Sequence, residues 1–80
     1  MTSTEVKQQL RNKLTELGYL KPGEILDDAQ VFRDLGVDSM VMITVIVSFE
    51  QITDVLVPDY DLTMENFYTV RAFCDYFGRQ

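Results

Sequence analysis

The stretch that most constrains this chain is a short loop motif followed directly by an apolar run. Residues 34–40 read Asp-Leu-Gly-Val-Asp-Ser-Met, and residues 41–49 are apolar except for Thr44 and Ser48. A short polar side chain directly before an apolar run is typical of a helix start. Asp38 or Ser39 can serve as the N-cap, because a side-chain oxygen accepts hydrogen bonds from the free N–H groups of the first turn. We therefore predict a helix that presents Ser39 at its N-terminus, where the helix dipole stabilises an anion.

The residue types that are missing exclude most catalytic chemistry at Ser39. The 80-residue chain contains no histidine, so it can form neither a Ser-His-Asp triad nor a histidine metal site. Its single cysteine, Cys74, excludes an internal disulfide and a CxxC metal site. We interpret Cys74 as a small hydrophobic side chain, with a reactive thiol as the alternative. Neither a self-contained hydrolase nor a metal site is expected.

Charge and hydropathy indicate the class of protein. A net charge of −6 disfavours binding to nucleic acid or anionic membrane and favours partners with basic patches. No apolar run approaches the roughly 20 residues of a membrane span, and the N-terminus lacks the features of a signal peptide. We expect one monomeric, soluble and cytoplasmic domain that covers residues 1–80.

The first part of the chain predicts an amphipathic helix and a long connection. Thr2 and Glu5 match a capping box, and Gly18 is a plausible helix end. The buried face of this helix is expected to consist of Val6, Leu10, Leu14 and Leu17. Residues 19–38 then form a connection too apolar for a free linker, so it should pack onto the helices. Its apolar residues are Ile25, Leu26, Val31, Phe32, Leu35 and Val37. Its acidic residues lack the spacing of an EF-hand calcium loop.

The second helix is predicted from about Ser39 to Thr53. Its many β-branched residues would also suit a strand, but its length and the Glu50-Gln51 tail favour a helix. The inward face is expected to consist of Met42, Ile43, Val45, Ile46, Phe49 and Ile52. The outward side is expected to consist of Met40, Val41, Thr44 and Ser48. A helix that is apolar on nearly every side is buried, offers an apolar surface to a partner, or does both.

The last third of the chain predicts two further helices. Pro58 ends helical structure, Asp61 can cap a short helix from Leu62 to Tyr68, and Thr69 can cap a final helix from Val70 to Phe77. The final helix should turn Val70, Phe73 and Phe77 inward and end at Gly78. The fold class is therefore all-α.

These features together resemble the acyl and peptidyl carrier protein family over the whole chain. Residues Phe32–Met40 match the family signature Phe-x-x-Leu-Gly-x-Asp-Ser-(Leu/Met), and Thr69-Val70 gives a second match. The resemblance implies a four-helix bundle of the acyl carrier protein type. In that bundle a long ordered loop joins the first two helices, and the third helix is short.

The resemblance also implies a function. A phosphopantetheinyl transferase would move 4′-phosphopantetheine from coenzyme A to Ser39 Oγ, forming a phosphodiester. Asp38 would help the transferase to hold its metal and would orient the complex. The thiol of the arm would carry an acyl or aminoacyl group as a thioester. An acyl or aminoacyl ligase or transferase would load it, and enzymes of fatty-acid, polyketide or amino-acid-derived biosynthesis would receive it. The protein would be a carrier and not an enzyme. The alternative is an unmodified helical module that binds another protein.

The chain departs from the family in its second helix. Carriers of fatty-acid synthesis usually present several acidic residues there, whereas the first acid of this helix is Glu50. We therefore predict apolar docking of partners through Met40, Val41 and Thr44, with hydrogen bonding from Ser48.

Two features bear on the cargo. The Asp-Ser-Met sequence is similar to that of aminoacyl carriers such as the D-alanyl carrier protein, and a discrete carrier of a secondary-metabolite pathway fits equally well. One set of apolar residues could shelter an acyl chain, but we interpret it as plain core. These residues are Val45, Ile46, Phe49, Ala72 and Phe73.

Overall fold

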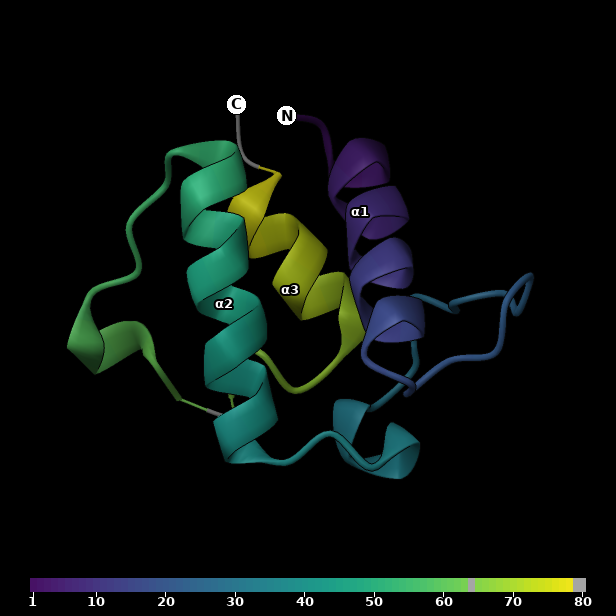
Figure 1. Ribbon diagram of the computed structural model, residues 1–80. Coiled ribbons are helices and arrows are strands. Elements are labelled where there is room, and N and C mark those ends of the chain that lie inside the picture. Colours follow the sequence, from purple (N-terminus) through teal and green to yellow (C-terminus); the bar gives the residue numbers. More distant parts are fainter. Residues whose placement is uncertain (64, 79–80) are drawn as a thin grey trace.

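The computed structural model describes residues 1–63 and 65–78, which form three α-helices around a small apolar core. The helices are α1 (Ser3–Glu16), α2 (Ser39–Thr53) and α3 (Val70–Phe77), and two 3₁₀ helices span Phe32–Leu35 and Asp59–Asp61. The described part of the chain contains no strand, only an isolated bridge between Val31 and Thr69. In Figure 1, α3 lies between α1 and α2, and the start of α1 and the end of α3 lie at the same end of the molecule. No described helix is both long and apolar enough to cross a membrane.

Local hydrogen bonds set the starts of the helices. Thr2 and Glu5 form the predicted capping box before α1, with the Glu5 N–H donating to Thr2 Oγ1 at 3.2 Å and the Thr2 N–H donating to Glu5 Oε1 at 3.0 Å. Thr69 Oγ1 accepts the Ala72 N–H at 3.2 Å at the start of α3. Both caps are confirmed, and so are the bounds predicted for α2 and α3.

The core is organised around the phenylalanines. All five are buried, and the Phe73 ring on α3 packs against the other four at centroid distances of 4.9 to 5.8 Å. Aromatic pairs at such distances add about 0.5–1.5 kcal/mol each beyond the burial of their area. The helix α1 packs against α3 and contributes Val6, Leu10 and Leu14, which are fully buried as predicted. Leu17, predicted on the same face, lies beyond the end of α1 and is exposed.

The connection between α1 and α2 is fixed onto α3. Leu26, Phe32 and Val37 are buried, and Val31 and Leu35 are half-buried, as expected for a connection that packs onto the helices. The N–H groups of Val70 and Arg71 donate to the carbonyls of Gln30 and Asp28 at 3.0 and 2.9 Å. The connection thus supplies acceptors for N–H groups that a helix start leaves free. The prediction is wrong for Ile25, whose side chain is 86% exposed.

The predicted short helix from Leu62 to Tyr68 is wrong for the residues that the structure describes. The 3₁₀ helix Asp59–Asp61 and a turn at residues 65–67 occupy this region, and residue 64 lies outside the described part. Asp61 is not an N-cap, because it is the last residue of this 3₁₀ helix and no helix of the described residues begins directly after it. Its carbonyl accepts from Asn66 Nδ2 and its Oδ2 from the Tyr76 hydroxyl, both at 2.9 Å. The described fold is therefore all-helical with three α-helices instead of the four expected.

The inward face of α2 is narrower than predicted. Met42, Val45, Ile46 and Phe49 are at most 3% exposed. Ile43 and Ile52 were also expected to face inward, but they are 50% and 47% exposed. Phe49 packs on Phe73 and Phe77 of α3, which fixes the rotation of α2 about its axis. Since successive helical residues are about 100° apart, Ile43 then points away from the core that Met42 enters.

Candidate functional site

Ser39 is the first residue of α2, and its side chain is exposed. The residue before it, Asp38, is extended and caps the helix, with its Oδ1 accepting the Val41 N–H at 2.9 Å. The Asp38 carbonyl accepts the Met42 N–H at 2.9 Å. Within the described part of the chain, the N–H groups of Ser39 and Met40 donate no hydrogen bond. Two backbone donors and the positive end of the helix dipole are therefore available beside the Ser39 hydroxyl.

The loop before Ser39 is held in place by its own residues. Phe32 and Val37 are buried, and the Val37 N–H donates to the Phe32 carbonyl at 3.2 Å. Gly36 ends the 3₁₀ helix with a φ of 88°, a conformation that is costly for a residue with a Cβ atom. The Leu-Gly of the motif thus has a structural role, since Leu35 packs against the core and Gly36 makes the turn that leads to Ser39.

Two hollows meet at Ser39. The larger, with a volume of about 340 Å³, is lined by Arg33, Gly36, Val37, Asp38 and Ser39. The smaller, of about 80 Å³, lies between α2 and the segment that follows it. It is lined by Ser39, Met42, Ile43, Ile46, Leu62, Thr63 and Phe67. Ser39 therefore has a charged side, which holds Arg33 and Asp38, and an uncharged, mainly apolar side.

Arg33 is the residue of this site to which the sequence analysis assigned no role. It is exposed on the 3₁₀ helix Phe32–Leu35, and no carboxylate of the described residues lies within 4.0 Å of its guanidinium. Its neighbour Asp34 lines a different hollow, together with Asp27. One sequence feature could have indicated a role for Arg33, since it is the only basic residue of the motif Phe32–Met40.

Four exposed residues of α2 that lie between Ser39 and Glu50 form what we call the outer face: Met40, Ile43, Thr44 and Val47. Met40 is 78% exposed and Val47 is 46% exposed, and Thr44 Oγ1 donates to the Met40 carbonyl at 3.2 Å. The helix carries no charged residue before Glu50. Met40 and Thr44 lie outward as predicted, but Val41 and Ser48 are half-buried. The prediction is wrong for Val41 in particular, because its side chain packs against the core.

The Cys74 thiol takes no part in the site around Ser39. Its side chain is buried in the core, and burial raises the pKa of the thiol to about 11. A thiol with so high a pKa is protonated near neutral pH and is a poor nucleophile. The structure therefore favours the interpretation of Cys74 as a small hydrophobic residue.

Two acidic residues of the connection, Asp27 and Asp28, have protein partners. Asp28 pairs with Lys7 at 2.8 Å and with Arg71 at 3.8 Å, and the hydrogen bond from Lys7 is the main cause of the lowered pKa of Asp28. Asp27 Oδ1 accepts the Ala29 N–H at 3.0 Å. Residues 1–63 and 65–78 contain no group of three or more side chains suited to hold a metal ion.

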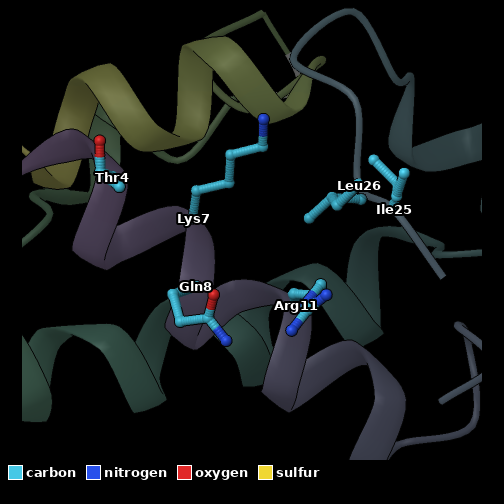
Figure 2. A pocket seen from close by; sticks show the side chains of 6 residues that line it. All are labelled: Thr4, Lys7, Gln8, Arg11, Ile25 and Leu26. Atoms are coloured by element: carbon cyan, nitrogen blue, oxygen red, sulfur yellow. The ribbon is translucent and has the colours of Figure 1, made fainter. Parts of the chain in front are cut away.

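A further hollow, of about 200 Å³, lies between α1 and the segment around Ile25 and Leu26 (Figure 2). Lys7 and Arg11 of α1 line it, and none of its lining residues belongs to the two hollows at Ser39.

A comparison with protein families matches residues 4–77 to the family described as "Phosphopantetheine attachment site". The matched residues run from α1 to the end of α3 and include those that line the two hollows at Ser39. A search of solved structures gives no significant match.

Proposed function

Because the chain belongs to the phosphopantetheine attachment-site family, whose members are carriers of covalent 4′-phosphopantetheine and not enzymes, we propose that Ser39 receives this group. The observation that carries the proposal is the environment of the Ser39 hydroxyl. It is exposed at the N-terminus of a 15-residue helix, with two free backbone donors beside it and a hollow of about 340 Å³ in front of it. A phosphodiester fits there, because it is an anion and needs donors and space.

The residues around Ser39 have separate roles in this attachment. Ser39 Oγ forms the new bond to phosphorus, the bond from that phosphorus to the bridging oxygen of the coenzyme A diphosphate breaks, and adenosine 3′,5′-bisphosphate leaves. The transferase takes the Ser39 proton, since no histidine exists in the chain. The Asp38 carboxylate caps α2 through Oδ1 while the residue stays exposed, so it holds the helix start and remains accessible to the transferase. Once attached, the arm supplies a thiol on which an acyl or aminoacyl group is held as a thioester.

The proposed cargo is an acyl or aminoacyl intermediate of fatty-acid, polyketide or amino-acid-derived biosynthesis. The proposed docking surface is the outer face of α2, because it lies directly beside Ser39, is largely apolar and carries no charge. Desolvated apolar side chains usually carry most of the free energy of an interface, so the partner should present a complementary apolar surface. The surface predicted from sequence contained Val41 and Ser48. The proposed docking surface contains Ile43 and Val47 instead, because Val41 and Ser48 are half-buried.

The attachment is tested by intact mass spectrometry after incubation with coenzyme A and a broad-specificity phosphopantetheinyl transferase. The wild type should gain one phosphopantetheine, and Ser39→Ala should gain none. Ser48→Ala is the matched control, because it removes another serine of α2 and should be modified like the wild type. An unmodified wild type would favour the alternative of an unmodified interaction module. An adduct that persists in Ser39→Ala would contradict Ser39 as the attachment residue.

A further inference from the structure

We propose that Arg33 binds the phosphodiester on Ser39 and thereby anchors the proximal end of the arm; this inference rests on the proposed function. A guanidinium group offers planar pairs of N–H donors that match two oxygens of a phosphate group. Arg33 lines the same hollow as Ser39. The contact would make Arg33 a positioning residue of the carrier.

The backbone of Arg33 is held in a fixed relation to Ser39. The Arg33 carbonyl accepts the Gly36 N–H at 3.0 Å, and the Phe32 side chain beside it is fully buried. Only the short turn 36–38 then separates the 3₁₀ helix from α2. The base of the Arg33 side chain is therefore anchored, while the residue is exposed and lines the hollow.

The charges around Ser39 favour a role for Arg33. Modification adds a negative charge next to the Asp38 carboxylate, and like charges in close proximity repel each other. Among the described cations, Arg33 alone lines a hollow that contains Ser39. Lys7, Lys13 and Arg71 each have a carboxylate partner within 4.0 Å, whereas Arg33 has none among the described residues. Arg33 can thus bind the phosphate without breaking an existing ion pair.

The inference is tested on the modified protein by nuclear magnetic resonance. The ³¹P signal of the phosphodiester is compared in the wild type, Arg33→Gln and Arg33→Lys at low ionic strength, after mass spectrometry has verified full modification. Arg11→Gln is the matched control, because Arg11 lines the separate hollow on α1 that Figure 2 shows. We expect Arg33→Gln to shift and narrow the ³¹P signal, Arg33→Lys to have a smaller effect and Arg11→Gln to leave the signal unchanged. High salt should move the wild-type signal towards that of Arg33→Gln, since it screens exposed charges.

A second measurement needs no variant. The Nε–Hε signal of Arg33 should shift, and its exchange with water should slow several-fold, when the unmodified protein is converted to the modified one. An unchanged Arg33 signal, or the same ³¹P signal in the wild type and Arg33→Gln, would overturn the contact and leave the carrier function intact. Equal shifts in Arg33→Gln and Arg11→Gln would also overturn it, because they would reflect net charge alone. A protein that gains no phosphopantetheine would refute both the attachment and the contact.

Discussion

The inner and outer faces of α2 are built from almost the same side chains. The inner face has Met42, Val45, Ile46 and Phe49, and the outer face has Met40, Ile43, Thr44 and Val47. Each face thus has one methionine, one isoleucine and one valine. Residues of the inner face are at most 3% exposed, whereas Met40 on the outer face is 78% exposed. Burial of such a side chain contributes about 1.5–3 kcal/mol, so the inner face stabilises the fold while the outer face keeps its apolar area available for a partner.

The largest effect on stability is expected at Phe49. Phe49→Ala removes a fully buried ring that packs on Phe73 at 4.9 Å and on Phe77 at 5.6 Å. We expect the free energy of unfolding to fall by about 3–5 kcal/mol, measured in denaturant. If Phe49→Ala is largely unfolded, Phe49→Leu can be measured instead, because it should lower the free energy of unfolding by a smaller amount. A loss below about 1 kcal/mol, which is typical of exposed positions, would break the distinction between the faces.

The pH dependence of unfolding tests how dry the core beneath the inner face is. The pKa of Cys74 is raised by burial from 9.0 to about 11, so between these values the unfolded chain has lost the thiol proton and the folded chain retains it. The free energy of unfolding therefore falls as the pH rises between these two values, by about 1.4 kcal/mol per pH unit and by about 2–3 kcal/mol in total. Cys74→Ala lacks this thiol and is therefore the control. Equal slopes in the two proteins would show that water reaches the Cys74 thiol.

Three valines of α2 allow the same truncation on each side of the helix. Val45 is buried, Val41 is half-buried and Val47 is 46% exposed. We expect substitution by alanine to lower the free energy of unfolding by about 2–3 kcal/mol at Val45, about 1 kcal/mol at Val41 and no more than about 0.5 kcal/mol at Val47. Denaturant unfolding of the three variants gives the order directly. A larger loss at Val47 than at Val41 would mean that α2 is rotated from the orientation described above.

The smallest effect on stability, with a large effect on transfer, is expected at Ile43. Ile43→Asp places a charge on the outer face and should change the free energy of unfolding by no more than about 1 kcal/mol. It should slow the transfer of cargo to a partner enzyme, because a charged group in an apolar interface loses its water. Ile25→Asp is the matched control, since Ile25 is 86% exposed and lies on the connection between α1 and α2. If the two variants transfer cargo equally well, the outer face of α2 is not the docking surface.

Several parts of the candidate site could be predicted because they depend on neighbours in the sequence. The Asp38 cap joins residues three positions apart, and the turn at Gly36 has a hydrogen bond from the Gly36 N–H to the Arg33 carbonyl, also three positions away. Contacts between distant residues could not be predicted in this way. Asp61 was expected to cap a helix, but its carboxylate accepts the hydroxyl of Tyr76, 15 residues later. The presence of Arg33 in the Ser39 hollow likewise depends on how the 3₁₀ helix packs through Phe32 on Phe73.

The sequence by itself determined that this chain has an apolar second helix with Ser39 exposed at its start, because caps, turns and helix ends are short-range interactions. Only the tertiary structure decided which methionine, isoleucine and valine of that helix are buried. The period of a helix predicts which residues lie on the same side, but it does not predict which side turns toward the core. Because α2 is apolar on nearly every side, several of its sides could have done so. The contact between Phe49 on α2 and Phe73 on α3, 24 positions apart, is part of the packing that selects one of them.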